Sequence, residues 1–252
     1  MLNSLIAWWQ RRQALRELSH VNRREDERIL FDNSNLFEQA TNAMARGDLV
    51  EVSKCWTSIR ERHPRLVMSN HDSLSIMLSL QLYDEAEQVM KKGLKEHPRD
   101  PHYREGLAQI SQRRGNFAAS NRQWTKIRRS YPSRFPAYLF GAQALKELGR
   151  LADAERLTSL AISRFPDGQE CTACWIEHAR VAEAAQKWNL ALERWSHVDF
   201  ECCHVSGAIG AARALKKLGQ PTEAKERLLS RTYRYGNEHE FKIALTEMLD
   251  DR

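Results

Sequence analysis

The sequence predicts an all-α fold, a solenoid of about six helical hairpins, and three regularities of the chain predict it. A turn-like triplet returns every 34 residues through the first four copies, and then after 37 and 33 residues. Small side chains recur seven residues before and five residues after the start of each triplet. A proline follows 17 residues after each of the first four starts. Such a period is typical of stacked repeats, which present extended binding surfaces and rarely contain catalytic groups.

The turn triplets mark the middle of each expected hairpin. They start at Gly47, Gln81, Gly115, Gly149, Gln186 and Gly219. Glycine suits this place because a tight connection between helices needs backbone angles that other residues avoid. The prolines end the second helix, since proline lacks an amide N–H and biases the preceding residue away from helix. They are Pro64, Pro98, Pro132 and Pro166, and the last two copies have Cys203 and Gly236 instead, so we expect less regular helix ends there.

Two positions in every copy predict closely packed helix pairs, because small side chains let the helix axes approach. Before the turn they are Ala40, Leu74, Ala108, Ala142, Ala179 and Ala212. After the turn they are Val52, Ala86, Ser120, Ala154, Ala191 and Ala224. Four residues further on stand Trp56, Met90, Trp124, Thr158, Trp195 and Leu228. Most of these side chains are large and apolar, and we expect them to fill the space between successive hairpins.

In its turns, small positions and closing prolines, the segment 33–238 resembles the tetratricopeptide repeat. The resemblance implies a right-handed superhelix whose first helices line the concave side, and an array that binds peptides or other proteins. One sub-class holds acidic C-terminal tails with a lysine–asparagine clamp on its first helices. The corresponding pairs here are Phe37/Thr41, His71/Ser75, Glu105/Gln109 and Leu139/Gln143, which exclude that sub-class. The chain departs from the family where the first-helix tryptophan or tyrosine is expected, because only Tyr138 and Trp175 supply it.

Two segments flank the repeats. Residues 239–252 have helical spacing of apolar side chains and are expected to form a C-terminal capping helix. Residues 1–32 are amphipathic and basic, with Leu2, Leu5, Ile6, Trp8, Trp9, Arg12 and Arg16. This N-terminal helix is expected to cap the first hairpin or dock a partner, and the alternative is contact with a membrane surface, which tryptophans beside arginines favour.

Composition bounds the environment and the partners. The chain has 42% hydrophobic and 29% charged residues and a net charge of +6, which favours acidic partners. It contains no apolar run of about 18 residues and no secretory signal pattern, and its five cysteines are an odd number. We therefore expect a cytoplasmic protein, peripheral at the inner membrane if the N-terminal helix contacts lipid.

The cysteines form the sharpest local pattern. Cys171 and Cys174 open the fifth hairpin, and Cys202, Cys203 and His204 close it. Because the two helices of a hairpin are antiparallel, both groups are expected at the same end of the hairpin. Structural thiols are the favoured interpretation, and a tetrahedral zinc site or a redox dithiol are the alternatives.

The third hairpin has a basic run around two aromatic residues. The cations are Arg113, Arg114, Arg122, Lys126, Arg128, Arg129 and Arg134, and the aromatics are Trp124 and Tyr131. Phosphate-neutralising cations beside stacking rings are typical of nucleic-acid binding. Trp124, however, holds a core position of the repeat, which favours a solvated face or a patch for an acidic partner.

The sequence contains no nucleophile–base arrangement, H-E-x2-H motif or glycine-rich phosphate-binding loop, so we expect neither enzymatic activity, a cofactor nor a small-molecule substrate. The residue patterns around Trp56, Trp124 and Phe165-Pro166 resemble those of bacterial repeat proteins that accompany glycosyltransferases, sulfotransferases or polysaccharide machinery. The sequence therefore predicts a protein-binding adaptor, with an envelope or polysaccharide-biosynthesis assembly as its setting. A nucleic-acid binder using the third hairpin and a peripheral membrane adaptor are the alternatives.

Overall fold

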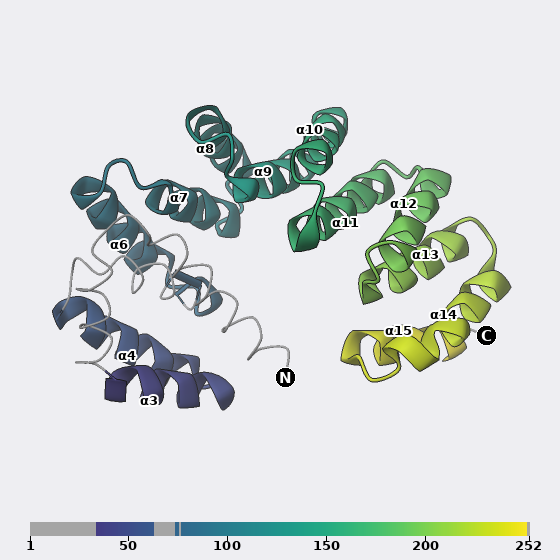
Figure 1. Ribbon diagram of the computed structural model, residues 1–252, viewed down its shortest axis with the longest axis horizontal. Coiled ribbons are helices and arrows are strands. Elements are labelled where there is room, and N and C mark those ends of the chain that lie inside the picture. The colour runs from purple at the N-terminus through teal and green to yellow at the C-terminus, as the bar shows by residue number, and fades with distance from the viewer. Residues whose placement is uncertain (1–33, 63–73, 76, 251–252) are drawn as a thin grey trace. The chain divides into compact units, whose positions relative to one another are not determined.

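A computed structural model describes residues 34–62, 74–75 and 77–250 of the chain (Figure 1). The expected N-terminal helix and Pro64 lie outside the described residues. The chain divides into two compact units, Met1–Gly115 and Asn116–Arg252, which are described separately. Within the described ranges the regular structure is helical throughout, and no strand occurs. The all-α prediction is confirmed.

The first unit contains α3 (Ser34–Ala45), α4 (Leu49–Arg62), α6 (Tyr83–Glu96) and α7 (Pro101–Arg113). Helix α3 packs on α4, and α6 packs on α7. Trp56 and Ile59 of α4 lie in the core of the first pair, while Met90 and Tyr103 join α6 to α7. Arg114, just after α7, forms ion pairs with Asp84 and Glu87 of α6.

The second unit contains eight helices in chain order (Figure 1). They are α8 (Phe117–Ser130), α9 (Phe135–Glu147), α10 (Leu151–Arg164), α11 (Gly168–Ala184), α12 (Trp188–Phe200), α13 (Val205–Lys217), α14 (Pro221–Tyr235) and α15 (His239–Asp250). Each helix packs on the next, and α11 also contacts α9 and α13. Helices α9, α11 and α13 are thus the first helices of successive hairpins, and α10, α12 and α14 are the second helices.

The repeat positions behave as the sequence predicts. All twelve small positions before and after the turns are buried, and so are the six positions four residues further on. Trp124 and Trp195 are among the largest side chains with almost no exposure. Trp124 stacks on Phe140 of α9 with a ring separation of 5.5 Å, which shows how the large position joins one hairpin to the next.

The turn starts share one backbone conformation. All six have positive φ angles, at Gly47 (75°), Gln81 (58°), Gly115 (75°), Gly149 (71°), Gln186 (57°) and Gly219 (80°). The two glutamines therefore adopt the left-handed conformation that glycine adopts in the other copies. This position demands positive φ whichever residue stands there.

The helix ends follow the prolines. Helices α6, α8 and α10 end two residues before Pro98, Pro132 and Pro166, and the residue between has left the helical conformation in each case. Where proline is missing, the ends differ: Cys203 after α12 has a φ of 54°, and Gly236 after α14 keeps helical angles. The three extra residues of the long fifth step lie in the first turn of α11.

The last helix covers the end of the final hairpin. Phe241 of α15 is fully buried, and its ring lies 5.9 Å from that of Tyr235 in α14. Leu245 and Met248 pack against the same core. A helix in this place removes apolar surface from water that the next repeat would cover in a longer array.

Candidate functional site

The first helices of the second unit place equivalent side chains in neighbouring rows. Steps of 37 and 33 residues relate the members of each row, and residues four and three apart share one side of a helix. The rows are Leu139, Ile176 and Ile209; then Gln143, Arg180 and Arg213; then Lys146, Glu183 and Lys216. We call these nine residues the first-helix face. Because α11 contacts both α9 and α13, the rows are continuous across the three helices.

A buried carboxylate joins the first two helices of this face. Glu177 of α11 has a side chain only 1% exposed. Lys146 of α9 donates to it at 2.7 Å and Gln143 of α9 donates at 3.4 Å. Arg180, one turn along α11, has a nitrogen 3.7 Å from the same carboxylate. A buried negative charge is tolerated only when paired, so these cations and the amide are held in place by it.

A second carboxylate joins α11 to α13. Glu183 accepts hydrogen bonds from Nε and Nη2 of Arg213 at 2.9 and 3.2 Å, and from Nε1 of Trp195 at 3.0 Å. The Arg213 guanidinium lies over the Trp195 ring, 5.9 Å from its centroid. Trp195 therefore fills the core with its ring while its single donor orders the surface carboxylate.

The result is a face with fixed yet accessible cations. The side chains of Arg180 and Arg213 are 49% and 50% exposed although each has a carboxylate partner. An arginine has five N–H donors in a planar fork, so both side chains retain donors for a second acceptor. Beside them the half-buried Ile176 and Ile209 supply apolar surface. The chemistry of this arrangement suits carboxylates and apolar side chains, and its nine residues include no nucleophile or acid–base pair.

Sequence reasoning tested part of this face for a clamp but did not find the charge pairs. The signal was present as a carboxylate and a cation about one repeat apart, 31 residues for Lys146 and Glu177 and 30 residues for Glu183 and Arg213. In a chain with 29% charged residues, many such spacings occur by chance. Only the alignment of one hairpin on the next in the folded structure decides which carboxylate and cation form a pair.

A buried network on the second helices is structural. Arg194 of α12 pairs with Glu155 of α10 and donates to the His178 carbonyl at 2.8 Å. The His178 ring lies with Nδ1 2.7 Å from Thr158 Oγ1 and Nε2 3.8 Å from Glu155. Burial, and then the nearby Arg194 charge, lower the pKa of His178 to about 4. Burial alone would raise the pKa of Glu155, but the hydrogen bond from Arg194 lowers it.

Asp199 at the end of α12 organises the last two hairpins. It is fully buried and accepts hydrogen bonds from Arg227 and Arg231 of α14 at 3.1 Å. Both guanidinium groups also lie over the half-exposed ring of Phe200, at 5.2 and 4.6 Å from its centroid. This cluster joins helices α12 and α14.

The basic run of the third hairpin is divided between the two units, and several of its residues are engaged within the protein. Arg114 lies in the first unit and is paired with acidic side chains. Trp124 is fully buried, as the sequence indicated, and cannot stack on a base. Arg128 points into the protein and donates to the Ala137 carbonyl. Arg122 and Arg129 remain exposed.

Some of the cysteines lie near each other. Burial, and to a lesser extent the nearby Cys171, raise the pKa of Cys202, which is consistent with the start of α11 lying near the end of α12. Cys174 is buried, and burial raises its pKa to about 12, which opposes the thiolate that zinc binding or redox exchange requires. His204 uses Nδ1 to accept the Ser206 amide at the start of α13. Across the described ranges no group of three or more His, Cys, Asp or Glu side chains is placed to hold a metal ion.

The membrane alternative depends on the N-terminal residues 1–32, which lie outside the described part. Among the helices that the structure describes, none has the length and apolar character needed to cross a membrane.

Comparison with known proteins identifies the architecture. No family model and no curated protein matches the sequence. Among solved structures, PilW, a widely conserved type IV pilus biogenesis factor, matches with a TM-score of 0.65 at 16% identity, over 84% of this chain and 98% of PilW.

Two further structures are named as tetratricopeptide-repeat proteins. A thermophilic one from Thermus thermophilus matches with a TM-score of 0.59 at 15% identity, over 72% of this chain and 98% of that protein. One from Parabacteroides merdae matches with a TM-score of 0.59 at 12% identity, over 86% of this chain and 99% of that protein. Identities this low establish shared architecture only. With its repeated turns, buried small positions and stacked hairpins, the chain has the tetratricopeptide-repeat fold.

Proposed function

We propose that the chain is a non-catalytic scaffold that binds a partner protein through the first-helix face. The observation that carries the proposal is the state of Arg180 and Arg213, each of which has a carboxylate partner while about half of its side chain stays exposed. The complementary partner is an extended segment with carboxylates next to apolar side chains. The carboxylates would pair with the arginine forks, and the apolar side chains would lie on Ile176 and Ile209.

The energetics favour such a role. Ordering a long, flexible side chain on binding costs free energy, and here Glu177 and Glu183 have already ordered the arginines. Binding across α9, α11 and α13 then adds small contributions from several repeats. Because the exposed cations contribute electrostatically, the affinity should fall as salt concentration rises.

The setting of this scaffold is a bacterial envelope or polysaccharide-biosynthesis assembly. Two observations support this finer proposal. The residue pattern of the repeats resembles that of bacterial repeat proteins that accompany such machinery. PilW, whose fold the chain shares, is itself a pilus biogenesis factor.

The test is affinity purification of the tagged full chain from its native cells, with and without nuclease, followed by mass spectrometry. Wild type is compared with Arg180→Gln/Arg213→Gln, and the matched control is Arg122→Gln/Arg129→Gln on exposed positions of α8. We expect a nuclease-insensitive protein in near-stoichiometric amount, reduced about tenfold by the first-helix variant and retained by the control.

Two results would contradict the proposal. Retention of the partner by the Arg180/Arg213 variant at wild-type level would remove the first-helix face as the binding surface. Recovery of nuclease-sensitive material alone, lost in the Arg122/Arg129 variant, would replace the scaffold with a nucleic-acid binder. Thermal unfolding of both variants must match wild type, so that loss of binding is not loss of folding.

A further inference from the structure

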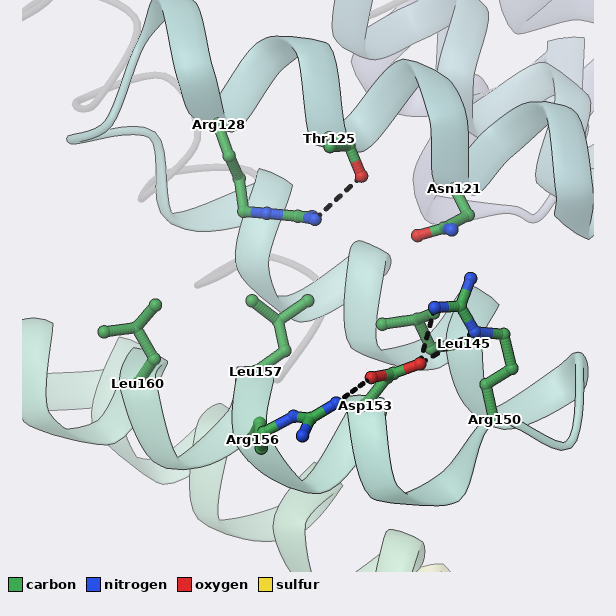
Figure 2. A pocket seen from close by; sticks show the side chains of 9 residues that line it. All are labelled: Asn121, Thr125, Arg128, Leu145, Arg150, Asp153, Arg156, Leu157 and Leu160. Atoms are coloured by element: carbon green, nitrogen blue, oxygen red, sulfur yellow. Dashed lines mark hydrogen bonds and ion pairs between the residues drawn. The ribbon is translucent and has the colours of Figure 1, made fainter.

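A second surface of the second unit, between α8 and α10, has the features of a binding site. An open pocket of about 430 Å³ lies between α8 and α10, with Leu145 of α9 in its lining (Figure 2). Its other walls come from Asn121, Thr125 and Arg128 of α8 and from Leu157 and Leu160 of α10. We call it the α8–α10 pocket. None of its residues belongs to the first-helix face.

The most unusual group in the pocket is Arg128. Its guanidinium donates to the Ala137 carbonyl at 2.8 Å and to Thr125 Oγ1 at 2.9 Å, both neutral acceptors. A Cβ atom on Gly141 would lie 2.2 Å from Nη1, so the guanidinium lies directly on the bare backbone of α9. Burial lowers the pKa of Arg128, since the charged form has lost much of its hydration.

Comparison within the same unit shows what Arg128 lacks. Arg194 pairs with Glu155, and Arg227 and Arg231 pair with Asp199. In the described part of the chain, no carboxylate pairs with Arg128. A largely buried arginine without a counter-charge is unfavourable in the free protein, and an incoming carboxylate would relieve it.

The remaining lining is apolar on one side and cationic on the other. Leu145 and Leu157 are buried, but Leu160 is 50% exposed at the edge of the pocket. Elsewhere in the lining, Arg150 and Arg156 both pair with Asp153 (Figure 2). Asp153 is the one carboxylate of the described lining, so three arginines outweigh it. The buried Oδ1 of Asn121 has no hydrogen-bond partner among the described residues and can accept from a ligand amide.

We propose that the α8–α10 pocket binds a peptide segment of a protein partner in which a leucine-sized side chain stands next to a carboxylate. The apolar side chain would lie on Leu157 and Leu160, the carboxylate would pair with Arg128, and a backbone amide would donate to Asn121. The pocket is open to solvent, whereas small-molecule sites enclose most of their ligand. An open pocket suits a segment that runs across it and continues over the surface.

This site is separate from the first-helix face and adds to the proposed scaffold function. One chain could then hold two segments, one on first helices and one between second helices. The two proposals therefore fail independently.

The test uses a random peptide display library selected in parallel on the full-length wild type and on two single variants, Arg128→Gln and Leu160→Ser. We expect wild type to enrich peptides that carry an acidic residue beside leucine, isoleucine or methionine. The affinity of an enriched peptide, measured by fluorescence anisotropy, should fall about tenfold in each variant. Leu160→Ser changes an exposed side chain, so it keeps the test informative if Arg128→Gln disturbs folding.

The controls separate this site from others. Leu229→Ser, at an exposed leucine of α14, and Arg180→Gln/Arg213→Gln should leave the affinity of the peptide unchanged. The proposal is overturned if no acidic–apolar sequence is enriched, if the variants bind it as wild type does, or if the first-helix variant abolishes binding. Displacement of the bound peptide by free dodecanoate at the same concentration as the peptide would also overturn the proposal, because a small amphiphile would then be the ligand.

Discussion

A single backbone angle defines the turn of every repeat. At Gly149 the φ angle is 71°, and at Gln186, the same place in the next copy, it is 57°. A Cβ atom added at Gly149 would meet nothing within 4 Å, so the cost of a side chain there is purely conformational. For residues other than glycine, the left-handed conformation costs about 1 kcal/mol or more. Gln81 and Gln186 therefore carry a small strain that the surrounding helices maintain.

Exchanging residues at this position should change stability in opposite directions. Gln186→Gly should raise the free energy of unfolding by about 0.5–1 kcal/mol, and Gly149→Ala should lower it by about 1 kcal/mol. Urea denaturation followed by circular dichroism measures both. Gln220→Gly is the control, because Gln220 has a φ of −114° and gains nothing from glycine. A destabilising effect of Gln186→Gly would show that its side chain, rather than its backbone, matters.

His178 should make stability depend on pH. Its pKa is lowered to about 4 in the folded protein from an ordinary value of 6.5, so the unfolded chain binds the proton first as pH falls. Stability is therefore highest above pH 6.5 and falls between pH 6.5 and 4, by an amount on the order of 2 kcal/mol. Glu155 and Arg194 are the charged groups around the ring, and the hydrogen bond from Arg194 holds the pKa of the Glu155 carboxyl below its ordinary value.

The measurement is the free energy of unfolding of wild type and His178→Gln between pH 7 and pH 5. Other histidines, His204 among them, titrate in both proteins, so the difference between the two curves isolates His178. The variant should lose less stability than wild type as pH falls. Parallel curves would mean that the buried ring takes up its proton at an ordinary pH.

At the scale of helices, close packing depends on missing side chains. Helix α13 has glycine at 207 and 210, where it crosses α12. A Cβ atom at Gly207 would lie 2.2 Å from the Asp199 backbone nitrogen, and one at Gly210 would lie 2.2 Å from the Trp195 ring. Backbone cannot move aside as a side chain can, so the contact at Gly207 sets the distance between the two helices.

Gly207→Ala should lower the free energy of unfolding by about 2 kcal/mol, although alanine favours helix more than glycine does. Chemical denaturation measures the change. The neighbouring substitution Ser206→Ala should stay within about 0.5 kcal/mol of wild type, since it adds no atoms at the crossing. If Gly207→Ala is neutral or stabilising, α12 and α13 are not in close contact at this point.

The sequence predicted features with a local, periodic cause. The turn glycines, the buried small positions and Trp124 in the core follow from a fixed period, and all are confirmed. The partners of buried charges could not be predicted, because Glu177 and Lys146 come into contact only through the way that successive hairpins align when they pack. The inward side chain of Arg128 had a usable signal, since it stands one helical turn after Trp124. Cys174 likewise faces the core, where burial raises the pKa of its thiol.

At the scale of the molecule, stability is distributed over neighbouring repeats. The hydrophobic clusters of the second unit each span successive helices, such as Trp195 with Ala211, or Leu228 with Phe241. In such arrays a repeat is stabilised mainly by its neighbours, and damage spreads over short distances along the chain. The chain also divides into two compact units at Gly115.

Gly207→Ala should therefore open the structure locally. In hydrogen exchange read by mass spectrometry, amides of α12, α13 and α14 should exchange faster than in wild type, while those of α3, α4 and α6 should be unchanged. The same experiment on Ser206→Ala should show no change in either region. Equal acceleration throughout would mean that the whole chain unfolds as one cooperative unit.

The buried ion pairs also make the repeats different from one another. Glu177 requires the lysine of the preceding hairpin, Glu183 the arginine of the following one, and Asp199 two arginines further on. Among the last three hairpins, duplicating, deleting or transplanting one would leave one of these charged groups without its partner. Lengthening this part of the array by copying a repeat, which uniform arrays tolerate, is thus penalised. The order of these three hairpins is therefore part of what the sequence encodes.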